Sequence, residues 1–252
     1  MSSRVGGFVG VLVIVVLWWL ASLVLFQGSG SIPTPPSVLA KFFDGDQWGA
    51  TLHNATSTVS SAVKGYLWGN LAAIGLAVVV LLVPRLEALA NQIAIVTYRI
   101  PLVAIGPVIV IVAGRQSPAG ASVVLAAMSC LVGLRAAPRT SIDLVRAYGG
   151  TAWTTLRKVQ LISALPSLFA ALKIAAPAAF LGAVLAEYLG SGGDATLGRA
   201  LIAAQTQSDA PQLWYLALVS GLISGLGYVL VGLVARVGTP WTTAADTPAG
   251  VR

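Results

Sequence analysis

Two ionisable side chains interrupt a long apolar run in the second half of the chain. Lys173 and Glu187 are the only charged residues within 168–189. A charge at the centre of a bilayer costs roughly 2.5–3.5 kcal/mol on insertion scales, so such residues are usually paired, placed near an interface, or part of a transport path. Their separation of 14 positions is about 21 Å along a helix, so they cannot pair with each other. Pairing or interfacial placement and a direct role in a solute path both stay open for each residue.

Residue types that serve catalysis and metal binding are scarce. His53 and Cys130 are the only histidine and the only cysteine, and the chain has eight acidic residues in all. A metal site needs several such ligands at suitable spacing, and a Ser-His-Asp constellation needs a well-placed histidine. The Gly-x-x-x-x-Gly-Lys-Ser/Thr loop that binds nucleotide phosphates is also absent. We therefore predict that the chain is not an enzyme and has no cofactor or metal of its own.

The composition is that of a membrane protein. Of the 252 residues, 57% are hydrophobic and 9% are charged, against about 45–50% and about 25% in soluble domains. The apolar residues form long blocks separated by short polar connectors, as membrane spans do. The net charge of +7 comes from basic residues scattered singly between these blocks, which argues against binding of nucleic acid.

The apolar blocks predict an all-α, polytopic fold with six transmembrane helices. The runs are 8–26, 66–83, 100–113, 121–134, 168–189 and 213–235. We expect a helical lead-in over 51–65, a surface helix over 88–98, and an outer loop over 27–51, where prolines, glycines and aspartates end the first helix. The chain then divides into a first helix with its outer loop (1–50), a permease core (51–238) and a cytoplasmic tail (239–252).

Glycines within these runs suggest close helix packing. Gly221 and Gly225 have the Gly-x-x-x-Gly spacing that lets helices approach closely in membranes. We expect tight packing within the chain at these positions, and no ligand is needed to explain them.

Basic residues set the expected orientation. With both termini in the cytoplasm, ten Lys and Arg residues fall on the inner side and only four on the outer side, namely Lys41, Lys64, Arg115 and Arg199. Connectors rich in Lys and Arg stay on the cytoplasmic side. The distribution therefore predicts a multi-pass protein of the cell membrane with cytoplasmic termini, Lys173 near the inner end of its helix and Glu187 near the outer end.

The long inner connector between the fourth and fifth runs carries the most informative pattern. Ser141 can cap a helix over 142–148, Gly149 can end it in the left-handed conformation, and Thr151 can cap a second helix. An apolar face on a helix outside the bilayer, here Leu144 with Tyr148, is typical of a surface that binds a protein partner.

This connector resembles the coupling motif of binding-protein-dependent ABC transporter permeases, which reads Glu-Ala-Ala, three residues, Gly, nine residues, Ile, any residue, Leu-Pro. Alignment of the motif glycine with Gly149 places Asp143 on the Glu and Leu161 on the Leu. Leu144, Val145 and Ile162 depart from the motif. The residues that the resemblance assigns to ATPase coupling are Asp143, Leu144, Val145, Arg146, Ala147, Tyr148, Gly149, Gly150, Thr151 and Trp153.

Other stretches resemble the nitrate, sulfonate, taurine and vitamin-precursor branch of that family. They are 99–107 (RIPLVAIGP), 146–149 (RAYG), 164–167 (ALPS), 171–174 (ALKI), 186–190 (AEYLG) and 197–198 (LG). The resemblance implies a prokaryotic importer with two cytoplasmic ATPases that hold ATP and Mg, a second permease that is the same or a related chain, and an extracytoplasmic solute-binding protein. The alternative is a secondary transporter or small channel without an ATPase.

Overall fold

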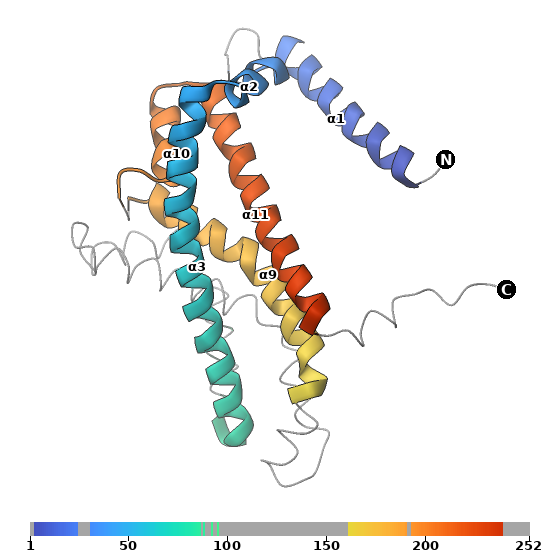
Figure 1. The fold of residues 1–252 in the computed structure, drawn as a ribbon, viewed down its shortest axis with the longest axis vertical. Coiled ribbons are helices and arrows are strands. Elements are labelled where there is room, and N and C mark those ends of the chain that lie inside the picture. Colours follow the sequence, from blue (N-terminus) through green and yellow to red (C-terminus); the bar gives the residue numbers. More distant parts are fainter. Residues whose placement is uncertain are drawn as a thin grey trace, which may run out of the picture.

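The computed structural model describes residues 3–24, 31–86, 161–190 and 193–238, with residues 88, 92 and 95 taken singly. Every regular element in these ranges is helical, which confirms the all-α prediction for this part of the chain (Figure 1). The elements are α1 (Ser3–Val24), α2 (Pro35–Phe42), α3 (Gly45–Leu82), the short 3-10 helix η1 (Pro84–Leu86), α9 (Leu161–Tyr188), α10 (Leu197–Thr206) and α11 (Ala210–Gly238). The predicted third and fourth spans, most of the surface helix and the coupling connector lie outside the described residues.

Three of the described helices are long and apolar enough to cross a membrane. They cover Gly6–Val24, Leu168–Tyr188 and Ala210–Gly238, and they match the runs predicted as spans one, five and six. The run predicted as span two forms the second half of α3, which is not one of these three. The count of six spans therefore stays a prediction.

The predicted loop over 27–51 is only partly a loop. Its second half holds α2 and the first turns of α3. Pro35 and Pro36 stand in the first turn of α2, where a proline is favourable because its missing N–H would have no partner inside the helix. The side chain of Asp44 accepts a hydrogen bond from the backbone N–H of Gln47 and so begins α3 six residues earlier than expected.

The hydrophobic core lies at the end of the molecule where α2, α10 and the N-termini of α3 and α11 meet, and we call this the α10 end. Its buried residues come from five helices and include Val38, Phe180, Leu197, Tyr215 and Leu216. α9 crosses the bundle obliquely in Figure 1 and packs against both α3 and α11, while α10 packs on all three of these helices.

Alanines of α9 allow the close packing that we had expected of glycines. Ala175, Ala179, Ala183 and Ala186 recur at intervals of three and four residues, so they share one face of α9, and each is at most 1% exposed. By contrast, no described atom lies within 4 Å of the Cβ position at Gly221 or Gly225. The predicted tight contact at these two glycines is therefore wrong within the described residues.

α1 joins the bundle only near its C-terminal end. The indole Nε1 of Trp18 donates a hydrogen bond to the carbonyl of Pro33 (3.1 Å), and the Ser22 hydroxyl donates to the carbonyl of Ile32 (2.8 Å). The Trp18 ring also stacks on Trp214 of α11, with centroids 5.1 Å apart. Among the described residues, these contacts tie α1 to the segment before α2 and to the start of α11.

Replacement of Ala183 by leucine tests the alanine face of α9. The side chain of Ala183 is 0% exposed, so Ala183→Leu is expected to destabilise the purified protein by about 1–3 kcal/mol through overpacking. The measurement is the midpoint of thermal unfolding in detergent. Ala170→Leu is the matched control, because Ala170 is exposed on the same helix. An equal effect of the two substitutions would show that α9 does not pack through this face.

Candidate functional site

The buried carboxylate of Glu187 joins three helices. Glu187 lies in the last turn of α9 and is 0% exposed. Its Oε2 accepts hydrogen bonds from the hydroxyl of Thr58 on α3 (2.8 Å) and from the backbone N–H of Gly198 on α10 (3.2 Å). The Thr58 hydroxyl in turn accepts from the backbone N–H of Leu197 (3.0 Å). One carboxylate and one hydroxyl thus occupy the N-terminus of α10, where free N–H groups favour an anion.

The other oxygen of Glu187, Oε1, is buried and has no hydrogen-bond partner among the described residues. No described lysine or arginine forms an ion pair with this carboxylate. Glu187 therefore does have close structural partners, but they are neutral donors on α3 and α10. Glu187 lies at the α10 end of its helix, and its placement near the outer side of the membrane stays a prediction.

The segment between α9 and α10 allows Glu187 to contact the N-terminus of α10. Gly190 has a φ of 97°, a left-handed conformation that ends α9 without steric cost. Thr196 then caps α10, with its side chain accepting from the N–H of Arg199. At Gly198 an added Cβ would lie 2.5 Å from the Cβ of Glu187 and 2.6 Å from the carbonyl oxygen of Val184. Glycine is required there because the backbone of α10 touches α9.

Lys173 has a separate environment on the same helix. Its Nζ lies 4.3 Å from the centroid of the Tyr228 ring on α11, a cation–π contact. Its side chain runs close to Gly232, where an added Cβ would be 3.2 Å from Lys173 Cε. At the neighbouring position of α9, the Tyr66 hydroxyl of α3 donates to the carbonyl of Leu172 (3.2 Å). Lys173 and Glu187 thus have different partners, and the structure does not bring them together.

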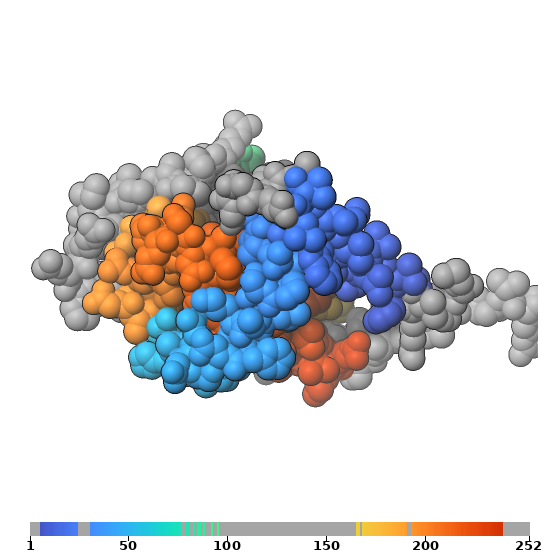
Figure 2. Space-filling model, turned by 90° about the horizontal axis from the view of Figure 1, so that it is seen from above, coloured from blue at the N-terminus to red at the C-terminus, as the bar shows by residue number. Residues whose placement is uncertain are grey.

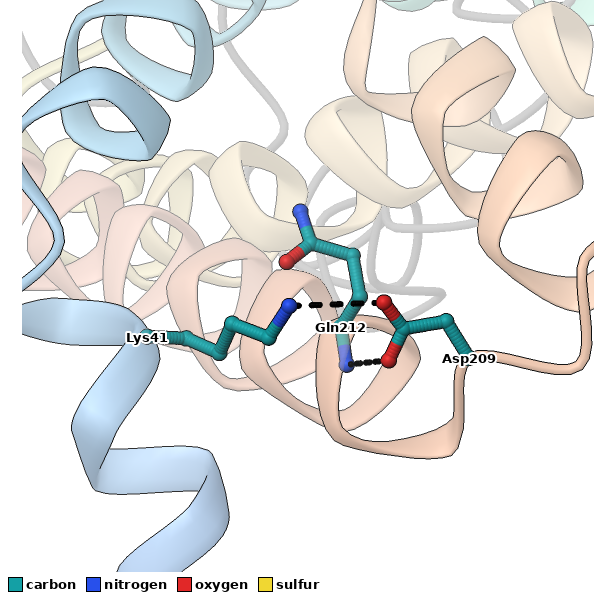
Figure 3. A network of polar contacts seen from close by, with 3 residues as sticks. All are labelled: Lys41, Asp209 and Gln212. Carbon is teal, nitrogen blue, oxygen red and sulfur yellow. Dashed lines mark hydrogen bonds and ion pairs between the residues drawn. The ribbon is translucent and has the colours of Figure 1, made fainter.

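A polar network connects α2 with the start of α11 at the α10 end (Figure 3). The Nζ of Lys41 forms an ion pair with Oδ2 of Asp209 (3.3 Å), and Oδ1 of Asp209 accepts from the backbone N–H of Gln212 (3.0 Å). Asp209 therefore caps α11 and holds α2 at the same time. Because Lys41 and Asp209 come from the two connectors predicted to lie outside, the contact agrees with their placement on one side of the membrane.

Thr58, Gly198 and Asp209 were not singled out as site residues by the sequence. Gly198 stands in the Leu-Gly pair at 197–198, which was noted only as part of a family resemblance. Nothing in the sequence marks Thr58, since its role depends on a residue 129 positions away. The predicted coupling residues lie outside the described ranges. Within those ranges, no group of three or more His, Cys, Asp or Glu residues is placed to hold a metal ion.

Comparison with known protein families shows to which of them the chain belongs. The family described as binding-protein-dependent transport system inner membrane component matches residues 65–243, which is more than half of the chain. The chain belongs to this family. It is an ABC transporter permease, a multi-pass membrane protein, and the family is a transport component rather than an enzyme.

Three relatives of the permease share about a quarter of its residues. The riboflavin transport system permease protein of Chloroflexus aurantiacus is 26% identical over 239 residues, covering 91% of this chain and 88% of the relative. A probable ABC transporter permease of Haemophilus influenzae is 27% identical over 187 residues, covering 71% and 75%. The formylaminopyrimidine transport permease protein of Halalkalibacterium halodurans is 26% identical over 163 residues, covering 62% and 64%. These similarities favour the ABC permease over the alternative of a secondary transporter or channel.

Removal of the Thr58 hydroxyl tests the Glu187 junction of the permease. Thr58→Val keeps the side-chain shape but deprives Glu187 Oε2 of one donor and the N–H of Leu197 of its acceptor. The expected destabilisation is about 1–3 kcal/mol, measured as thermal unfolding in detergent. Thr56→Val is the control, because the Thr56 hydroxyl is exposed and bonds only to the carbonyl of His53 in its own helix. A Thr58→Val protein as stable as the control variant would contradict the junction.

Proposed function

We propose that this permease is the membrane-spanning subunit of an ATP-driven importer. In this proposal an extracytoplasmic binding protein delivers a small solute, and two cytoplasmic ATPases drive its passage through a pair of permease chains. The observation that carries the proposal is the family match over 65–243 together with a relative aligned over 91% of the chain. The coupling motif around Gly149 supports the ATPase partners.

Charge at the two ends of the described bundle supports the proposed orientation. Among the described residues outside the predicted spans, the α10 end carries four carboxylates, Asp44, Asp46, Asp194 and Asp209, and two basic residues, Lys41 and Arg199. The opposite ends of α3 and α11 carry Arg85 and Arg236. Basic connectors remain in the cytoplasm, so the α10 end faces outward and the long connector between the fourth and fifth runs faces the ATPases.

The coupling segment is proposed to be the contact with the ATPases. Its ten residues, from Asp143 to Trp153 without Ala152, are predicted to include a short helix that ends at Gly149. Closure of the ATPases on ATP would move this helix and reorient the spans on either side of it, giving alternating access. Leu144 and Val145 depart from the family motif, and this slightly favours a related second permease over a second copy of this chain. A changed coupling helix is tolerated when the second permease carries one that fits its ATPase better.

The solute is proposed to be a vitamin or vitamin precursor. The named relatives are permeases for riboflavin and for formylaminopyrimidine. At 26% identity these names support a class of solute and not one compound. Riboflavin and formylaminopyrimidine are therefore the first compounds to test.

Reconstitution is the decisive test of the function. The permease is placed in proteoliposomes with candidate ATPase and binding-protein subunits from the same organism, and ATP-dependent uptake of the two compounds is measured. Gly149→Val is expected to lower solute-stimulated ATP hydrolysis at least tenfold, because a β-branched residue tolerates positive φ poorly. Gly149→Asn, which adopts that conformation more readily, is expected to retain most coupling. Uptake that does not depend on the ATPase would overturn the proposal.

Membrane orientation gives a second, independent test. Single cysteines introduced into a Cys130→Ala background at Asp46 and Ser208 are expected to react with an impermeant maleimide added to intact cells. Cysteines at Thr154 and Thr243 are expected to react only after the membrane is opened. The reason is the ten-to-four distribution of basic residues between the two sides. Labelling of position 154 from outside would contradict the orientation and the coupling role together.

A further inference from the structure

Two basic side chains lie where α9 and α11 pack together, toward the end of the bundle away from α10 (Figure 1). The Nζ of Lys173 is 4.3 Å from the centroid of the Tyr228 ring and would be 3.6 Å from a Cβ added at Gly232. Arg236 follows Gly232 by one turn, about 6 Å along α11, and its Cβ tilts toward the helix N-terminus and thus toward Gly232. We call Lys173 and Arg236, together with Tyr228, the basic cluster.

No acidic side chain of the described residues pairs with the basic cluster. Neither Lys173 nor Arg236 belongs to the ion pairs found among these residues. The described carboxylates all lie at the α10 end, and they are Asp44, Asp46, Glu187, Asp194 and Asp209. Lys173 stands inside the spanning stretch Leu168–Tyr188, where a charge is costly and an aromatic ring compensates it only in part. An anion that contacts both cations would therefore be favourable there.

The basic cluster borders an exposed apolar surface. Arg236 is exposed and Lys173 is half-buried. Leu233 and Val237 of α11 are 51% and 83% exposed, and Ile174, next to Lys173 on α9, is 59% exposed. Figure 2 looks from the α10 end and shows the red end of α11 at the edge of the molecule. Exposed apolar side chains beside two cations suit the acyl chains and the phosphate of a phospholipid, respectively.

We propose that the basic cluster binds the phosphate group of an anionic phospholipid. The guanidinium of Arg236 has a planar fork of donors that suits two phosphate oxygens, and the ammonium of Lys173 has three donors. The ring of Tyr228 holds that ammonium beside α11. The acyl chains then pack on the exposed side chains of Leu233 and Ile174. A lipid fits better than a free anion, because a free anion would leave this apolar surface uncovered.

The proposed orientation decides which leaflet supplies the lipid. It places the Arg236 end of α11 on the cytoplasmic side, so the lipid comes from the inner leaflet. Basic sites between spanning helices on that side are known to bind acidic head groups. The binding itself does not depend on the importer function, because the lipid surrounds the permease whether or not a solute is transported.

Native mass spectrometry of the full-length permease tests this site. The protein is delipidated in detergent and titrated with phosphatidylglycerol, and the dissociation constant of the first bound lipid is measured. Arg236→Gln and Lys173→Gln are each expected to raise this constant about tenfold, because each removes a charged donor to the phosphate. Lys173→Arg keeps the charge and is expected to stay within about threefold of the unaltered protein. Val237→Lys adds a cation at an exposed position beside Arg236 and is expected to lower the constant about threefold, which misfolding cannot imitate.

Arg85→Gln is the matched control for the loss of one charge. Arg85 is exposed and lies at the same end of the bundle as Arg236, but after α3, so its loss is expected to change the constant by less than about twofold. Equal effects of Arg85→Gln and Arg236→Gln would overturn the inference, since the attraction would then be a general one. Equal binding of phosphatidylethanolamine, whose head group has no net charge, would also overturn it. Competition by inorganic phosphate at equal concentration would make the cluster a site for free anions instead. Cysteine labelling that reverses the orientation would move the lipid to the outer leaflet and would overturn the inner-leaflet assignment alone.

Discussion

A carboxylate withdrawn from water must receive hydrogen-bond donors from the protein, and Glu187 receives them from two other helices. The hydroxyl of Thr58 and the N–H of Gly198 meet at one of its oxygens, so α3, α9 and α10 are joined at a single point. Inside a membrane neither water nor lipid replaces a lost donor, which makes this junction costly to open. The glycine at 198 and the left-handed Gly190 are consequences of the same constraint, because α10 must approach α9 within backbone contact.

The rest of the α10 end is built outward from that junction. α10 covers the buried core formed by Phe180, Leu197 and Tyr215, and Asp209 then starts α11 and fixes α2 through Lys41. α1, by contrast, contacts this assembly mainly through Trp18. The described part of the bundle therefore has one firmly connected end.

The composition of the chain reflects its place in the membrane. Only 9% of its residues are charged, and the Gly-x-x-x-x-Gly-Lys-Ser/Thr sequence does not occur in it. Among the described charges, Lys173 lies over the ring of Tyr228 and Lys41 pairs with Asp209. Small residues of both helices allow α9 and α11 to approach. Alanines of α9 are buried, and at Gly232 of α11 an added Cβ would lie 3.2 Å from Lys173 Cε.

The sequence alone determined the class of protein, because apolar runs of spanning length and singly placed basic residues are local signals that do not depend on packing. It also determined the family resemblance and the three spanning helices that the structure describes. The boundaries of α2 and α3 were harder to predict from the sequence, since prolines and aspartates begin helices as readily as they end them. Only the tertiary structure decided which donors surround Glu187, which face of α9 is buried, and that Asp44, Asp46 and Gln212 line one pocket. Some of these contacts join segments far apart in the chain, as between Thr58 and Glu187, which are 129 positions apart, and no pattern within either segment encodes which residue the other will present.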